Sequence, residues 1–135
     1  MSAPFHRYLK CERGSSAAEF ALVFPLAVVL IFGTIHISAA LYATATMHTA
    51  VEEAARCAAV RTDTCSDATT TQAYAANFYT GPGASPTFVY ATDATCGSPS
   101  DSTRPGHRVT GSASYSINFG FLSKTIPIQA TACFP

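Results

Sequence analysis

Hydrophobic residues are concentrated in one long run near the N-terminus of the chain. No charged residue occurs from Phe20 to Val51, and the 23 residues from Phe20 to Tyr42 are mostly apolar. A helix of that length is about 34 Å long, which is enough to cross a hydrocarbon core of about 30 Å. A chain of 135 residues is too short to surround such a helix on every side. The pattern therefore predicts a membrane-spanning helix rather than a buried core helix.

The helical pattern continues beyond the apolar run, and we expect one helix over residues 15–61. Small residues recur at steps of three and four along its second half, at Ala43, Met47, Ala50, Ala54 and Cys57. Such a stripe suits close packing, either on the chain's own globular part or on a neighbouring helix. Pro25 lies well inside the span and removes one backbone hydrogen bond, so it predicts a kink or local melting of the helix.

The rest of the chain predicts a small domain of mixed structure over residues 62–135. A short helix is expected from Thr70 to Tyr79, ending at Gly81-Pro82-Gly83, and a strand from Thr87 to Ala91. Prolines, glycines and serines between Asp93 and Gly106 predict a long surface loop.

Two further strands are expected near the C-terminus. Apolar and polar residues alternate over residues 108–121, and again over residues 125–134. Pro127 cannot donate a hydrogen bond, so the second of these strands is expected at a sheet edge or with a bulge. The predicted fold class is α+β, with a long N-terminal transmembrane and stalk helix followed by a small disulfide-bonded antiparallel sheet.

Charge is sparse and balanced. The chain has 8 Lys and Arg and 8 Asp and Glu, with no basic stripe to neutralise phosphates, so we expect no nucleic-acid partner. The segment before the apolar run carries Arg7, Lys10 and Arg13 against Glu12. Basic residues beside a first span favour a cytoplasmic N-terminus. Residues 1–14 are thus expected on the cytoplasmic side of the inner membrane, and residues 62–135 in the periplasm.

The cysteines agree with that placement. Four of the five, Cys57, Cys65, Cys96 and Cys133, follow the predicted span. Four thiols in a small exported domain predict two disulfides, for which three pairings exist. We favour Cys57–Cys65, which closes a short loop at a helix end, and Cys96–Cys133, which ties the chain end to a long loop.

Glu19 immediately precedes the apolar run. A carboxylate near lipid needs either a partner or a position close to the bilayer surface. Cleavage after Gly14 would create a cationic α-amine on Ser15 and make Glu19 the fifth residue of the mature chain. Residues four apart are neighbours on a helix, so the Ser15 amine would be able to pair with Glu19 of the same chain or of a neighbouring one.

The segment from Arg13 to about Ala59 resembles the N-terminal region of TadE-like minor pseudopilins of tight-adherence (Flp, type IVc) pilus systems. The resemblance rests on Gly14, Glu19, Phe20, Pro25, Gly33 and the Glu-Glu-Ala-Ala-Arg stretch from Glu52 to Arg56. The chain departs from the family at His36, since family members often carry a Glu soon after the glycine.

The resemblance implies a function in pilus assembly. A prepilin peptidase of the inner membrane would remove residues 1–14 by cutting between Gly14 and Ser15. The mature chain would be a minor subunit that initiates, primes or caps the pilus. Its implied partners are the major Flp pilin, other minor pseudopilins, the inner-membrane assembly platform and membrane lipid. Glu19 and Phe20 would serve processing and assembly.

Two other readings stay open. Residues 1–45 also resemble a secretory signal, and a cut after Ala40 or Ala45 would release a secreted disulfide-bonded domain. Alternatively, the chain is an uncleaved single-pass anchor of another envelope complex.

The sequence does not predict an enzyme. The four histidines, His6, His36, His48 and His107, occur in separate settings, and no serine-hydrolase, P-loop or zinc-protease motif occurs. His48 and Glu52 share a helix face, as metal ligands can, but two ligands without a third do not make a site. We therefore expect no cofactor and no metal.

Overall fold

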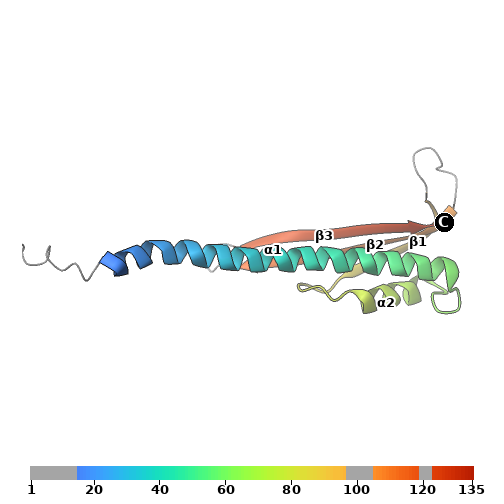
Figure 1. The fold of residues 1–135 in the computed structure, drawn as a ribbon. Coiled ribbons are helices and arrows are strands. Elements are labelled where there is room, and N and C mark those ends of the chain that lie inside the picture. The colour runs from blue at the N-terminus through green and yellow to red at the C-terminus, as the bar shows by residue number, and fades with distance from the viewer. Residues whose placement is uncertain (1–14, 97–104, 119–122) are drawn as a thin grey trace, which may run out of the picture. The chain divides into compact units, whose positions relative to one another are not determined.

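The computed structural model describes residues 15–96, 105–118 and 123–135. In chain order, its elements are helices α1 (Ser15–Val60) and α2 (Ala68–Phe78) and strands β1 (Thr87–Thr95), β2 (Pro105–Asn118) and β3 (Ser123–Phe134) (Figure 1). The fold is α+β with a long N-terminal helix, as the sequence predicted.

The chain divides into two compact units, residues 1–36 and residues 37–135, and α1 contributes to both. In the first unit the described residues form helix throughout, and Phe20, Leu22, Leu30 and Ile35 are among its large side chains that are more than half exposed. The helix passes through Pro25 without interruption, so the expectation of local melting there is wrong. The surrounding residues are strong helix formers, and one missing hydrogen bond does not end the helix. The kink at Pro25 stays a prediction.

The second unit contains a three-stranded antiparallel sheet with the order β1-β2-β3. Val109 in the central strand pairs with Tyr90 of β1 and Ala132 of β3, which fixes the register. Strand β3 is an edge strand, and Pro127 lies in it opposite Ser114 without a register shift. The edge position predicted for this proline is confirmed, since an edge strand has one side on which a donor is not needed.

The core of the second unit lies between α1 and one face of the sheet. The buried α1 residues Ala43, Met47, Ala50, Val51 and Ala54 belong to one hydrophobic cluster with Phe88, Val109, Ile128 and Ala130. The small-residue stripe therefore packs on the chain's own globular part. Gly111 permits this close approach, because a Cβ there would collide with Met47 Sδ and the Phe88 ring.

Helix α2 begins with a capping box. The Asp67 carboxylate accepts a hydrogen bond from the backbone N–H of Thr70 (2.8 Å), and the Thr70 hydroxyl accepts one from the Asp67 N–H (3.1 Å). This start lies two residues before the predicted one, because the sequence reading did not include Asp67 as a cap. After α2, Gly83 adopts a φ of 122°, a conformation that favours glycine.

The predicted loop over residues 93–106 is partly wrong. Strand β1 continues to Thr95, and β2 already begins at Pro105. A register shift between Ala91 and Ala94 lets the two strands pair again, with Thr95 opposite Pro105. Such a bulge is not visible in an alternation pattern, which is why the strand was expected to end at Ala91.

Two disulfides link parts of the second unit. Cys57, near the end of α1, pairs with Cys65, and Cys96 pairs with Cys133 in β3. The Cα–Cα distances are 5.8 and 5.4 Å, within the usual range. This is the pairing favoured from the sequence.

Candidate processing and assembly site

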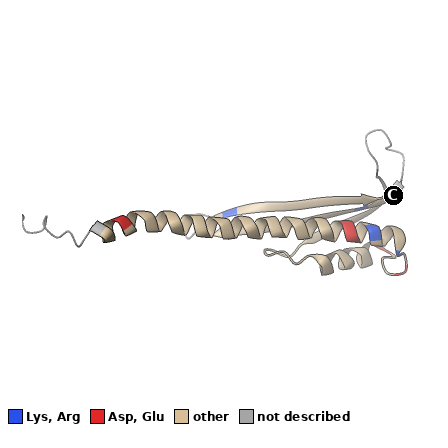
Figure 2. Cartoon of the chain, in the orientation of Figure 1, with Lys and Arg blue, Asp and Glu red and all other residues tan. Residues whose placement is uncertain are grey.

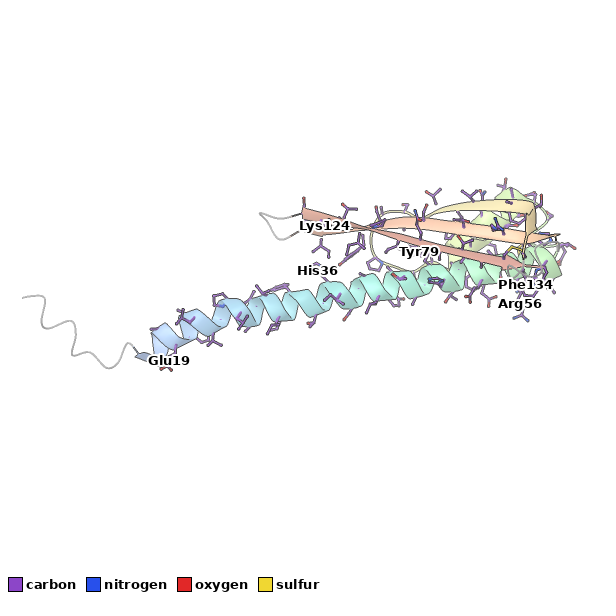
Figure 3. All side chains as sticks on the ribbon, turned by 90° about the horizontal axis from the view of Figure 1, so that it is seen from above. Glu19, His36, Arg56, Tyr79, Lys124 and Phe134 are labelled. Atoms are coloured by element: carbon purple, nitrogen blue, oxygen red, sulfur yellow. A yellow bond between two sulfur atoms is a disulfide. The ribbon has the colours of Figure 1, made fainter. Side chains whose placement is uncertain are left out.

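The predicted processing site lies at the start of α1. Ser15 is the first described residue and lies in α1, whereas Gly14 lies outside the described residues. Glu19 follows one helical turn later, with an exposed side chain (Figure 3). Four residues of helix rise about 6 Å, so a group on Ser15 and the Glu19 carboxylate occupy adjacent turns of one helix.

An aromatic pair lies directly beside this carboxylate. The rings of Phe20 and Phe24 stack with their centroids 5.3 Å apart. Phe20 is 66% exposed and Phe24 is 53% exposed. The helix start therefore combines one carboxylate with two exposed rings, a surface suited to lipid or to another helix.

Glu19 also dominates the charge of this part of the chain (Figure 2). The sequence from Ser15 to Val51 contains no other Asp, Glu, Lys or Arg. Among these residue types, one carboxylate therefore supplies the charge through which this segment can interact with a neighbouring molecule.

Helix α1 is long and apolar enough to cross a membrane. Its candidate span is Ser16–Val60, and the most apolar stretch within it contributes no buried residues. The core helix of a soluble protein would be mostly buried. The exposure of the apolar stretch of α1 therefore distinguishes α1 from such a core helix. The helix fits a single-pass anchor, although a secretory signal sequence passes the same test of length and composition.

A catalytic centre or metal site in the second unit would need polar side chains that are placed to act together. Among the described residues, no group of three or more His, Cys, Asp and Glu side chains is placed to hold a metal ion. A shallow hollow of about 310 Å³ lies between α1 and the end of β3, lined by Glu52, Glu53, Ala55, Arg56, Ala132, Cys133 and Phe134. Its two carboxylates and its guanidinium come from neighbouring turns of α1, and the residues that line it include no nucleophile paired with a base.

Two features of polar side chains in the second unit were not predicted from the sequence. The Tyr90 hydroxyl and His107 Nδ1 form a hydrogen bond of 2.6 Å, and the two rings stack 6.0 Å apart. Tyr79 has a buried hydroxyl, and burial raises the pKa of this group. The hydrogen bond depends on how β1 and β2 are paired, and the burial of Tyr79 depends on how the chain after α2 packs. A single sequence does not predict either contact.

The comparisons with known proteins concern the helix. Residues 14–56 match the family model described as TadE-like protein, which is roughly a third of the chain. The match begins at Gly14 and contains Ser15, Glu19, Phe20 and Pro25. No curated protein and no solved structure matches the chain. The family match identifies the segment from residue 14 to residue 56 as TadE-like, and it supports a TadE-like protein of the tight-adherence pilus system.

Proposed function

We propose that the chain is a minor pseudopilin that supports assembly or initiation of a tight-adherence pilus. A prepilin peptidase cuts between Gly14 and Ser15, and the mature chain keeps α1 as its membrane anchor. The observation that carries this proposal is the TadE-like match over residues 14–56, which starts at the proposed cut.

Glu19 is the proposed assembly residue. After cleavage, the Ser15 α-amine is cationic at neutral pH and lies one helical turn from the Glu19 carboxylate. Before assembly the two groups pair within one chain. In the assembly, Glu19 pairs with the amine of a neighbouring subunit and sets the register between helices, while Phe20 and Phe24 supply apolar contact.

The anchor also sets the proposed location of the rest of the chain. The basic segment before the span keeps the N-terminus in the cytoplasm and residues 62–135 in the periplasm. The disulfides Cys57–Cys65 and Cys96–Cys133 agree with an oxidising compartment. From there the domain meets the major pilin, other minor pseudopilins and the assembly platform, and we propose no enzymatic activity.

The core of the second unit bears on the secreted-domain alternative. Ala43 is fully buried, and the hydroxyls of Tyr42 and Thr80 form a hydrogen bond of 2.8 Å. A signal-peptidase cut after Ala45 would remove both contacts from the domain. A cut after Ala40 would leave Tyr42 and Ala43 in the released domain. The secreted-domain alternative is therefore tested as a cut after Ala40.

Processing of a glycine variant tests the proposal. The full chain is produced in cells with and without prepilin peptidase, and its mass is measured in the membrane fraction. We expect loss of residues 1–14 only with the peptidase, and no loss in Gly14→Leu, because a side chain at the cut obstructs the enzyme. Gly33→Ala is the control, since a Cβ at Gly33 meets nothing within 4 Å. Normal removal of the leader from Gly14→Leu would contradict the proposal.

A further inference from the structure

Charge is unevenly distributed along the second unit (Figure 2). The charged residues whose side chains the structure describes gather toward one end of it, except for Lys124: they are Glu52, Glu53, Arg56, Arg61, Asp63, Asp67 and Arg108. Lys124 lies apart from them at the start of β3, and its side chain is exposed. The four residues that join Asn118 to Ser123 in the sequence carry no charge.

Contacts within the unit show toward which part of α1 Lys124 lies. Gly111 lies against Met47 and pairs with Ala130 of β3. Farther along β3, Cys133 lines the hollow together with Arg56, nine residues later on α1. Strand β3 and helix α1 therefore advance in the same direction. The start of β3 points toward Ile37, and Figure 3 labels Lys124 and Phe134 at opposite ends of the strand.

Element lengths indicate how far the β2–β3 hairpin extends. From Gly111 to the end of β2 at Asn118 the strand covers about 23 Å, at 3.3 Å per residue. From Met47 back to Ile37 the helix covers about 15 Å, at 1.5 Å per residue. The hairpin end that carries Lys124 therefore reaches at least the level of Ile37, where the unit begins.

The helix surface at this level is apolar and exposed. Ile37 is 61% exposed, Leu41 is 66% exposed and Tyr42 is 53% exposed. Tyr42 is also anchored through its hydroxyl, which shares a hydrogen bond with Thr80. A tyrosine with an apolar ring and a bonded hydroxyl is typical of a membrane–water boundary.

We propose that this end of the unit, formed by Ile37, Leu41, Tyr42 and Lys124 and called here the membrane-proximal end, rests on the bilayer surface. The proposal depends on the proposed function in one respect, that α1 crosses the membrane. Since α1 is continuous from Ser15 to Val60, the end that carries Ile37 is the one next to the bilayer. The Lys124 ammonium pairs with lipid phosphate, and its aliphatic stem lies along the apolar surface.

The contact has a consequence for the anchor. If Ile37 lies at the bilayer surface, the residues from Ser16 to His36 make the crossing, and about 32 Å of helix matches the hydrocarbon thickness. Leu41 and Tyr42 then lie at the level of the lipid headgroups.

Single tryptophans test this contact, because the natural chain contains none. Three variants of the full chain are reconstituted in phosphatidylcholine vesicles containing phosphatidylglycerol and lipids brominated near the headgroup end of their acyl chains. Ser123→Trp reports on the hairpin end, and Phe134→Trp is its matched control at the other end of β3. Phe24→Trp reports on the span itself.

We expect the bromolipids to quench Phe24→Trp and Ser123→Trp but not Phe134→Trp. If Ser123→Trp is quenched as little as Phe134→Trp while Phe24→Trp is quenched, the membrane contact is wrong and the span stands. If Phe24→Trp is not quenched, the proposed anchor fails, and the membrane contact fails with it.

The role of Lys124 needs a second comparison. In the Ser123→Trp background, Lys124→Gln should lower the ratio of quenched to unquenched reporter by about fivefold in the anionic vesicles, the effect of one lysine near such a surface. Lys124→Arg should keep the ratio, because it keeps the charge. An unchanged ratio in Lys124→Gln would show that lipid phosphate does not hold this residue.

Discussion

Met47 and Gly111 lie in direct contact across the interface between α1 and the sheet. A Cβ at Gly111 would overlap Met47 Sδ and lie 2.8 Å from the Phe88 ring and 3.0 Å from Val51. At Gly111 the helix therefore approaches the central strand more closely than a side chain at that position would allow. This contact joins the second half of α1 to the sheet within the second unit.

Replacing that glycine should loosen the domain. Gly111→Val inserts a side chain that would overlap Met47, Phe88 and Val51, and overpacking of this kind costs about 1–3 kcal/mol. We expect a lower midpoint in urea unfolding of the detergent-solubilised chain, followed by near-ultraviolet circular dichroism. Ser112→Ala, one residue later and on the other face of the sheet, is the control and should unfold close to the natural chain. Equal midpoints for Gly111→Val and the natural chain would show that the contact is looser than described.

The two disulfides should differ in their contribution to stability. Their cysteines are 8 and 37 residues apart. In the chain-entropy model, closing the shorter loop stabilises by about 2.5 kcal/mol and closing the longer one by about 4 kcal/mol. The double variant Cys96→Ala/Cys133→Ala should therefore lose more free energy of unfolding than Cys57→Ala/Cys65→Ala. The opposite order in denaturant titrations would indicate that packing around Cys57 and Cys65, rather than loop closure, dominates.

Asp67 should make α2 sensitive to acid. Hydrogen bonds from the backbone N–H and the hydroxyl of Thr70 lower the pKa of the Asp67 carboxyl below its usual 3.8. A lowered folded-state pKa gives stability that is present above the unfolded-state value and is lost as the pH falls through the folded-state value. The cap should therefore weaken below about pH 3.8, whereas Asp67→Asn, which caps without titrating, should remove this dependence. A carboxyl pKa at or above 3.8, measured by nuclear magnetic resonance, would contradict the capping geometry.

Glu19→Ala should separate membrane insertion from assembly. Removing a carboxylate at the edge of the apolar run makes insertion no less favourable, so membrane levels should stay normal. Incorporation into the pilus assembly should fall strongly, because the partner of the neighbouring amine is lost. Glu19→Asp keeps the charge on a shorter side chain and should recover part of the function. Wild-type amounts of assembled pilus with Glu19→Ala would show that this carboxylate has no such role.

The sequence predicted the helices and strands that have a strong hydrophobic periodicity. It did not predict the features that depend on how one strand pairs with another. Charge-free residues from Phe20 onward predicted α1, which ends at Val60, one residue before the expected boundary. Alternation predicted β2 and β3 and the edge position of Pro127. The extension of β1 to Thr95 depends on a bulge that only the partner strand creates, and the Tyr90–His107 hydrogen bond depends on the resulting register.

The candidate site was predicted from one residue type in an unusual place. A carboxylate beside an apolar run is conspicuous in the sequence, and the structure places Glu19 on an exposed helix surface one turn after Ser15. The direction of the β2–β3 hairpin along α1 was not predictable. It follows from Gly111 meeting Met47, a contact between positions 64 residues apart in the sequence.

The N-terminal residue of the chain recovered from cells tests the central claim most directly. Protein is isolated from the membrane and from sheared pili, and its first residues are determined together with its intact mass. The account predicts that it begins at Ser15 and keeps the apolar helix through to residue 135. A chain that begins at Met1 or Ser2, or at Leu41 or Thr46, would contradict the account.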